Sequence, residues 1–509
     1  MNVINHISCI CSIGMCAIFM LSVGASVQTV EASSYNEQID IVYHLYEDGT
    51  TVVEALINLS RQTDNTYLTE FSFDLGGKRV SSANATINGQ VLTTTQSESS
   101  LSVMIPQEFG VQEELSLRLE FDLDALATHV GSVWEVFIPI ASSGDDITVT
   151  RQQISVITPL SWKSLWYSSH PYERIETTET SMLTRYQLDE TRQRNPLSLI
   201  YGEDQWYVVS AQYVLTNPSE QKVKQHIALI PDITGYQEMY VKSLEPMPSK
   251  LIIDSDQNWL SEYVLEAGET TSITYEAYVR LLKKSPRLVD NSESLVPYTI
   301  ADTYWESNDP RILDITATMS SAKDAYDYVT SQFTYGSTRA QGDAKRLGAV
   351  LALEKKDQAV CMEFTDMTIA SLRALSIPAR ELNGYAYVSK ANGVLHPTVS
   401  DELHSWVEYY DEQQGWTSID PTWGATTGDD YFSAFDSAHI VFVTHGISSS
   451  LPLPAGSYRL YNDTSRQVDV QVLDAAPAKM TRSWDWLDSY NYAQKPWWEK
   501  FWLWVSDLF

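Results

Sequence analysis

One cysteine in the body of the sequence lies where a thiol could act as a nucleophile. Cys361 stands in the run DQAVCMEFTDMTIASLRALSIPARELNGYAYV. Apolar side chains recur every three to four residues from Phe364 to Leu375, which predicts a helix that ends before Pro378 and begins near Cys361. At that end of a helix, the unpaired amides and the macrodipole favour a thiolate and can hold an oxyanion.

A histidine and an aspartate follow at a spacing that can complete such a site. Residues 403–410 and 416–420 read as two strands, and DEQQG at 411–415 predicts the turn between them. Across this hairpin His404 and Asp420 can approach each other, which supplies a base for the thiol and a carboxylate to orient the base. His396, His439 and His445 are the alternative bases.

Three blocks of sequence carry a resemblance to a known family. They are Cys361-x-x-Phe364, then LRALSIPAR at 372–380 with Gly384-Tyr385, and then His404-Ser-Trp-Val-Glu408 with Gly415-Trp416 and Asp420-Pro-Thr422. Together, over roughly residues 320 to 425, they resemble the core of the transglutaminase-like superfamily. The resemblance implies a papain-like fold in which Cys361 is the nucleophile, His404 the general base and later acid, and Asp420 the orienting carboxylate.

Three positions depart from the commoner family pattern. Ala359 stands where many members have glycine, Thr365 where many have alanine, and Ser405 gives His-Ser-Trp in place of His-Ala-Trp. All three departures leave the cysteine, histidine and aspartate in place.

Three tryptophans lie in or beside these blocks. Trp406, Trp416 and Trp423 are expected to line or roof the substrate cleft, although packing in the core is an equal reading for each. No metal or cofactor is expected, because one cysteine and scattered histidines lack the paired spacing of a zinc site and no EF-hand spacing is present.

The segments that position these residues divide the 509-residue chain into domains of different character. Short β-type runs with turn residues continue to about residue 290, and IDIVYHLY at 39–46 with TVVEALINL at 51–59 predicts a hairpin through Asp48-Gly49. Helical periods begin after Pro310. The expected fold is two N-terminal antiparallel β-sandwich-like domains, at 33–140 and 141–290, followed by an α+β papain-like domain at 291–445 and a tail at 446–509.

The first 32 residues read as an export signal. Residues 7–25 carry no charge, and small residues precede possible cleavage points after Ala25 or Ala32. An uncleaved membrane anchor is the alternative, since 19 uncharged residues are just long enough to cross a bilayer. The expected location is therefore secreted or in the cell envelope. Cleavage removes Cys9, Cys11 and Cys16, so the body has one thiol and no internal disulfide.

Composition and net charge indicate which classes of partner the chain can bind. With 43% hydrophobic and 20% charged residues the chain should fold, and a net charge of -32 without a visible basic patch argues against nucleic acid. Six of the 15 tryptophans fall within residues 484–504, which predicts a terminal helix docked on a β domain or, as the alternative, peripheral membrane contact.

The leading hypothesis is an exported cysteine enzyme that acts on amide bonds of proteins or peptides through a thioester, by acyl transfer or by hydrolysis. The alternative is a non-catalytic binding or scaffold protein of the cell envelope that retains the fold.

Overall fold

The structure is a computed structural model that describes most of the chain. It covers residues 21–28 and 35–500, apart from 63–66, 76–77, 98–99, 111, 125, 140, 143–146, 189–195, 284–286, 288–293, 341–344, 388–402, 458–466 and 497–498. The chain divides into two compact units between Glu203 and Asp204.

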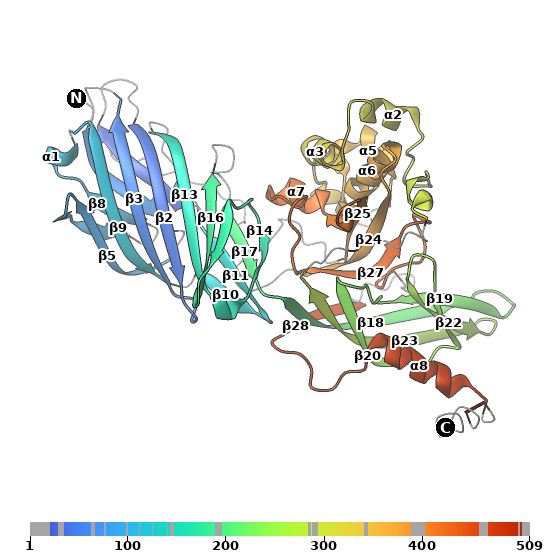
Figure 1. Cartoon of the computed structure of the whole chain (residues 1–509). Helices are drawn as coiled ribbons and strands as arrows, with labels where there is room; N and C mark the ends of the chain where they lie inside the picture. The colour runs from blue at the N-terminus through green and yellow to red at the C-terminus, as the bar shows by residue number, and fades with distance from the viewer. Residues whose placement is uncertain are drawn as a thin grey trace. The chain divides into compact units, whose positions relative to one another are not determined.

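The first unit is built of β-sheets. One sheet has the order β15-β16-β13-β2-β3-β9-β5-β6, and its strands from β16 to β5 are labelled in Figure 1. The second sheet has the order β12-β1-β4-β8-β7. A four-stranded sheet, β10-β11-β17-β14, completes the unit. The strands are β1 (Leu21–Gln28), β2 (Tyr35–Leu45), β3 (Thr51–Arg61), β4 (Tyr67–Asp74), β5 (Val80–Ile87), β6 (Gln90–Val91), β7 (Thr94–Gln96), β8 (Ser100–Met104), β9 (Glu114–Leu123), β10 (Ala127–Val130), β11 (Val133–Ile138), β12 (Ala141–Ser142), β13 (Ile147–Pro159), β14 (Leu165–Ser168), β15 (Arg174–Thr177), β16 (Ser181–Leu188) and β17 (Leu197–Tyr201), with a short helix α1 (Gln107–Gly110).

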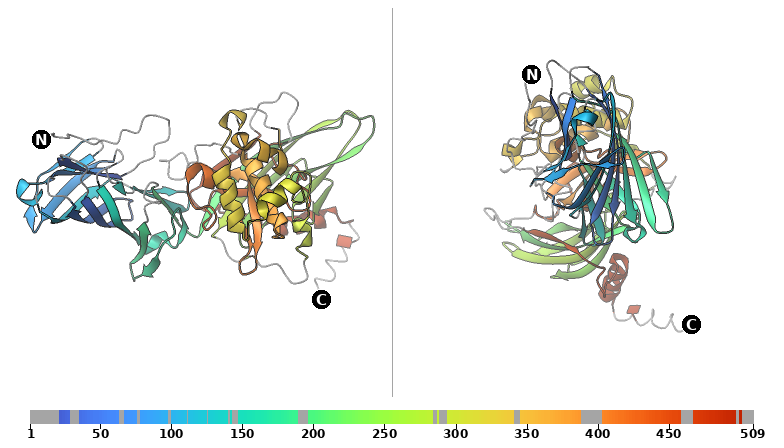
Figure 2. Two further views of the ribbon diagram at one scale, coloured as in Figure 1. Left: turned by 90° about the horizontal axis from the view of Figure 1, so that it is seen from above. Right: turned by 90° about the vertical axis from the view of Figure 1, so that its left-hand side faces the viewer.

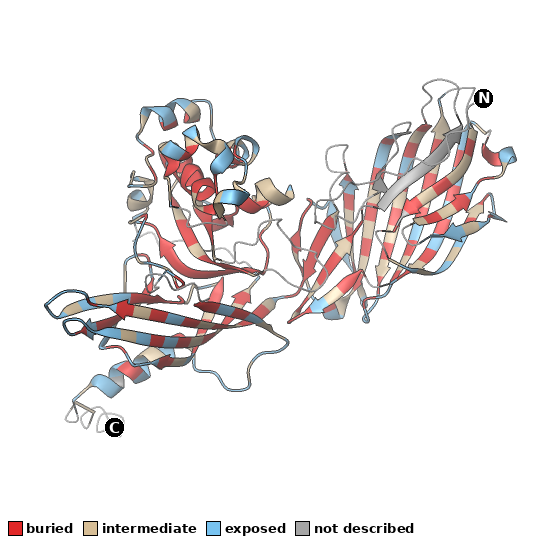
Figure 3. Ribbon diagram, turned by 180° about the vertical axis from the view of Figure 1, so that it is seen from behind, coloured by how far each residue is buried: buried red, intermediate tan, exposed pale blue. Residues whose placement is uncertain are grey.

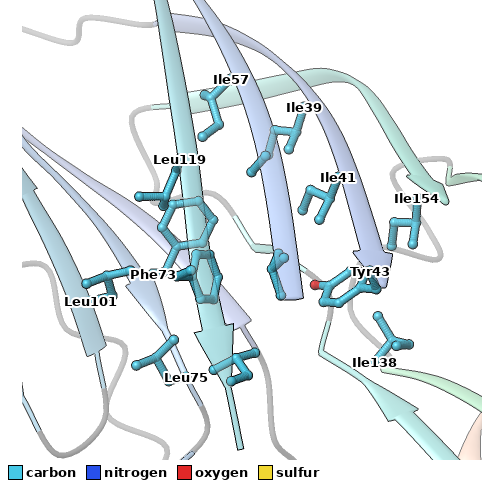
Figure 4. Packing of buried hydrophobic residues seen from close by; sticks show 14 of the residues in the cluster. Ile39, Ile41, Tyr43, Ile57, Phe73, Leu75, Leu101, Leu119, Ile138 and Ile154 are labelled. Carbon is cyan, nitrogen blue, oxygen red and sulfur yellow. The ribbon is translucent and has the colours of Figure 1, made fainter. Parts of the chain in front are cut away.

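Alternating side chains form the core of this unit. The predicted hairpin is confirmed as β2 and β3, which pair antiparallel, and Gly49 takes the positive φ of 82° that the turn requires. Every second residue is buried from Tyr35 to Leu45 and from Thr51 to Leu59, and Figure 3 shows such alternation along the strands of this unit. Ile39, Ile41 and Tyr43 point into one cluster with Phe73 and residues of β9, β11 and β13 (Figure 4).

The predicted boundary near residue 140 is wrong. β13 pairs in parallel with β2 and antiparallel with β16, so residues 141–201 continue the first unit. A parallel pairing between strands more than a hundred residues apart leaves no local signal, whereas the turn residues near 140 resemble a linker.

Part of the predicted export segment is a strand. β1 pairs antiparallel with β4, while residues 1–20 and 29–34 lie outside the described residues. No described helix is long and apolar enough to cross a membrane. Cleavage of this segment stays a prediction.

The second unit begins with a smaller pair of sheets. They have the orders β20-β23-β18-β28 and β19-β22-β21. Their strands are β18 (Asp204–Thr216), β19 (Val223–Leu229), β20 (Gln237–Glu245), β21 (Lys250–Ile253), β22 (Trp259–Leu265), β23 (Thr270–Leu282) and β28 (Val468–Leu473).

The segment expected as a tail from residue 446 adds a strand and a helix to this β domain. β28 pairs with β18. Helix α8 (Ser483–Gln494) lies against the domain (Figure 2), where Trp484 contacts Trp259 edge to face and the Tyr490 hydroxyl donates to the carbonyl of Pro248. Docking of the terminal helix is therefore confirmed for α8, whereas Trp497, Trp498, Trp502 and Trp504 lie outside the described residues.

The α+β domain follows. Its antiparallel sheet has the order β26-β25-β24-β27, and helix α6 packs against β24 and β25 (Figure 1). The elements are α2 (Pro310–Thr316), α3 (Ala322–Gln332), α4 (Ser337–Ala340), α5 (Ala349–Glu354), α6 (Cys361–Ala374), β24 (Ala379–Ala386), β25 (Leu403–Asp411), β26 (Gly415–Ile419), α7 (Pro421–Thr427) and β27 (His439–His445).

The sheets formed by β18 to β23 and β28 make up the second β domain. Two of its side chains bond to the outer edge of β27. The Gln237 amide accepts from the Val441 amide at 2.8 Å and donates to the Val441 carbonyl at 2.9 Å. Asn258 makes the same two bonds with Thr444, at 2.7 and 2.8 Å. Each side-chain amide thus takes the place of a peptide on a missing neighbouring strand, which satisfies an edge that would otherwise be unpaired.

We expect removal of either amide to destabilise the second unit. Gln237→Leu or Asn258→Leu leaves two backbone groups of β27 without partners, at a cost of about 3 kcal/mol in the free energy of unfolding. Urea denaturation followed by tryptophan fluorescence measures it. Gln221→Leu, at an exposed glutamine of the same domain, is the control; equal effects from all three variants would contradict the role of the amides.

Stability of the first unit should depend on the protonation of Glu37. This side chain is fully buried, neither carboxylate oxygen has a hydrogen-bond partner among the described residues, and burial raises its pKa to about 8. Because the pKa of Glu37 is higher in the folded state than in the unfolded state, low pH favours the folded state. Between pH 5 and 8 unfolding releases the proton, so the free energy of unfolding falls by about 1.4 kcal/mol per pH unit.

Glu37→Gln removes this slope. Calorimetric melting at several pH values tests it, with Glu120→Gln, at an exposed position on β9, as the control. A slope that persists in Glu37→Gln shows that another group causes it.

Candidate active site

Cys361 is the first residue of α6, as the sequence predicts. The helix runs from Cys361 to Ala374 and is buried along almost its whole length. The Glu363 carboxylate accepts the Val360 amide at 3.0 Å and pairs with Arg339, which fixes the first turn. The amides of Cys361 and Met362 have no acceptor within a helix that starts here, so they are available to an oxyanion.

His404 and Asp420 meet across the predicted hairpin, which is confirmed as β25 and β26. The distance from His404 Nε2 to Asp420 Oδ2 is 2.8 Å, and both side chains are buried. The other oxygen of Asp420 accepts the amides of Thr422 and Trp423 at 2.8 and 2.9 Å. Asp420 therefore caps the start of α7, where Pro421 fits because the first helical amide needs no partner.

Charge holds this pair together. Burial by itself would lower the pKa of His404, but the Asp420 carboxylate and, to a smaller extent, Cys361 raise it to about 10. Burial acts against the charge of Asp420 too, and the two imidazoles that face it nevertheless hold the pKa of its carboxyl far below its usual value. With Nε2 bonded to Asp420, Nδ1 is the nitrogen left to exchange a proton with the thiol.

Two of the three predicted tryptophans enclose the histidine. Trp406 stacks on the His404 ring at 6.0 Å between centroids and Trp423 lies at 5.8 Å. Both indoles are buried, so they shield the His404–Asp420 bond from water, as a packing role predicts. Contact of either indole with a substrate stays a prediction.

Trp416 lies elsewhere. It stands opposite Tyr410 in the β25–β26 ladder, and its ring packs on Tyr298 and on the Arg380 guanidinium. Tyr410 is six residues from His404, roughly 20 Å along an extended strand. The structure therefore does not bring Trp416 to His404.

Two of the departures from the family pattern contact each other. The Thr365 hydroxyl of α6 donates to the carbonyl of Ser405 at 3.0 Å, and the Ser405 hydroxyl lies 3.4 Å from Thr365 Oγ1. Thr365 lies one helical turn from Cys361 and Ser405 adjoins His404. The two hydroxyls thus connect the helix that carries the cysteine to the strand that carries the histidine.

Of the alternative bases, His439 lies in the site. Its Nε2 is 3.1 Å from Asp420 Oδ2, and its Nδ1 is 2.8 Å from Asp436 Oδ1. His445 instead pairs with Glu381 at 2.9 Å, and His396 lies outside the described residues. Asp436 lies in the loop before β27 and has no pattern in the sequence that predicts it as a site residue.

Among the described residues, one group of side chains could hold a metal ion. His404, Asp420 and His439 each place a ligand atom within 4.8 Å of the others. These atoms face one another at hydrogen-bonding distances, an arrangement that serves proton sharing as it stands.

Comparison with known proteins identifies the domain. Residues 311–421 match the transglutaminase-like superfamily. These residues are a transglutaminase-like domain.

The chain is also similar to curated proteins and to a solved structure. YebA of Bacillus subtilis is 28% identical over 232 residues, 39% of this chain and 31% of that protein. A protein-glutamine gamma-glutamyltransferase of Pseudomonas aeruginosa is 38% identical over 69 residues, 12% of this chain and 10% of that protein. The chain thus spans about a third or less of these curated relatives. The periplasmic domain of TgpA from Pseudomonas aeruginosa superposes with a TM-score of 0.23 at 14% identity, over 43% of this chain and 88% of that one.

We expect Thr365 and Ser405 to be coupled in their contributions to the free energy of unfolding. Thr365→Val keeps the side-chain shape and leaves the Ser405 carbonyl without its donor, so we expect the free energy of unfolding to fall by about 1 to 3 kcal/mol. Ser405→Ala removes only the 3.4 Å contact and should cost less. Urea denaturation of both single variants and the double variant measures the coupling.

Thr368→Val is the matched control, because Thr368 is buried on the same helix but bonds to that helix's own Phe364 carbonyl. Strictly additive losses for Thr365→Val and Ser405→Ala would show that the pair does not act as a unit.

Proposed function

We propose that this protein is a cysteine enzyme that acts on amide bonds of proteins or peptides through a thioester on Cys361. The observation that carries the proposal is the buried 2.8 Å bond between His404 and Asp420, together with the place of Cys361 at the start of α6 and its effect on the pKa of that imidazole. These residues supply a nucleophile, a base and a group that orients the base, the three parts that acyl transfer requires.

The reaction follows from these contacts. The proton of the thiol passes to His404 Nδ1, and the thiolate attacks the amide carbon, so that a C–S bond forms and negative charge moves to the oxygen. The amides at the start of α6 hold this oxyanion. His404 then protonates the departing amine as the C–N bond breaks, which leaves the thioester.

The fate of the thioester decides the activity. His404 deprotonates the incoming nucleophile, whose attack breaks the C–S bond and restores the thiol. An amine gives crosslinking, whereas water gives deamidation or proteolysis. The match with a protein-glutamine gamma-glutamyltransferase supports acyl transfer, and the abundance of water favours hydrolysis.

We further propose that the enzyme is exported and works outside the cytoplasm, either secreted or at the cell envelope. The uncharged run at residues 7–25 supports this location. Any contact with a membrane would then involve this segment or the tryptophans beyond α8, because α8 itself packs against protein.

The reactivity of Cys361 tests the proposed nucleophile without knowledge of the substrate. At pH 6 we expect iodoacetamide to alkylate Cys361 at least about tenfold faster than a model thiol, because His404 can accept the proton of the thiol as the sulfur attacks. Mass spectrometry of the peptide that contains Cys361 separates it from the three N-terminal cysteines. His404→Ala should abolish the excess rate.

A glutamine-rich protein, incubated with and without a fluorescent primary amine, then separates the activities. Amine incorporation indicates transfer, ammonia without incorporation indicates deamidation, and new fragments indicate proteolysis, each absent in Cys361→Ala. An unreactive Cys361 that is indifferent to His404→Ala would overturn the enzyme and favour the scaffold protein.

A further inference from the structure

A chain of buried groups continues behind Asp420. His439 on β27 faces Asp420 Oδ2 with one ring nitrogen at 3.1 Å and Asp436 Oδ1 with the other at 2.8 Å. Asp436 is fixed in turn, because its Oδ1 accepts the Ala438 amide at 2.8 Å and its Oδ2 accepts the Tyr431 hydroxyl at 3.0 Å. Asp420 thus lies between two imidazoles.

The contacts require a particular protonation state of His439. A neutral imidazole has one N–H and can satisfy only one of two carboxylates, whereas an imidazolium donates to both. Two ionised carboxylates in a buried site also need a compensating cation. In agreement, Asp436 and Asp420 raise the pKa of His439 although burial by itself would lower it.

The remaining surroundings of His439 leave this balance intact. The ionisable groups that face it are Asp420 after β26, His404 on β25, and Asp436 and Tyr431 in the segment before β27. Its other ring contacts are uncharged, with Trp406, Trp423 and Phe435 at 4.9, 4.5 and 4.6 Å between centroids. The Tyr236 hydroxyl of the second β domain donates to the His439 carbonyl at 2.8 Å and so holds its backbone.

We propose that His439 is a positioning residue that, as an imidazolium held between Asp420 and Asp436, orients the Asp420 carboxylate and limits its attraction for the proton of His404. This inference rests on the proposed function. Without the imidazolium, two carboxylates would act on one remaining histidine, and His404 would hold its proton too tightly to give it to the departing amine.

Two variants that remove the cation test the proposal. The rate of alkylation of Cys361 by iodoacetamide, measured from pH 5 to 11, contains the inflection at which His404 loses its proton. His439→Gln removes the cation directly and should move this inflection up by about one pH unit. Asp436→Asn leaves His439 facing one carboxylate, which a neutral imidazole satisfies, so it should move the inflection up as well, by a smaller amount. His445→Gln, at a buried histidine of the same strand that pairs with Glu381, should leave it in place.

The results that would overturn this proposal can be distinguished from the result that would contradict the proposed function. If wild-type Cys361 reacts in a His404-dependent way but both variants leave the inflection in place or move it down, His439 is only a packing residue. If His439→Gln does not fold, Asp436→Asn decides, since the side chain keeps its shape, and a downward or absent shift overturns the proposal. An unreactive wild-type Cys361 contradicts the proposed function instead.

Discussion

The site depends on one buried charge, the carboxylate of Asp420. Removing a carboxylate from water costs several kcal/mol unless hydrogen bonds and opposite charges replace the solvent. Four groups do so here: two backbone amides of α7 on one oxygen and two imidazoles on the other. Because every direction around the carboxylate is occupied, its position is fixed, and with it the plane and the tautomer of His404.

Other buried charges hold the elements around this centre. Glu363 and Asp366 on α6 are buried and pair with Arg339 and Arg346, and Arg346 also reaches Glu381 at 2.9 Å. Glu408 on β25 lies between Arg380 on β24 and Arg287, which forms an isolated bridge with Gly415 of β26. Apart from the Arg380–Glu408 pair, which lies within the sheet, each pairing ties α6 or the sheet to another segment. Such pairs stabilise little in net terms, yet the loss of one partner is costly, so they favour a single arrangement of helix and sheet.

The second β domain takes part in the same arrangement. Gln237 and Asn258 complete the edge of β27, and Tyr236 bonds to the carbonyl of His439. The effect of this domain on the site is indirect, since it fixes the strand that carries His439 rather than any atom near the thiol.

The sequence by itself determined the parts of the site that depend on local pattern. The period of α6 placed Cys361 at a helix start, and the alternation and turn at 403–420 brought His404 to Asp420, because helix phase and hairpin register follow from neighbouring residues. Only the tertiary structure decided the domain boundary at Glu203, the place of β28, the distance of Trp416 from His404, the Thr365–Ser405 contact and the partnership of His439 with Asp436. These depend on which distant segments pack together, and long-range pairing is selected by the whole core rather than by any local run of residues.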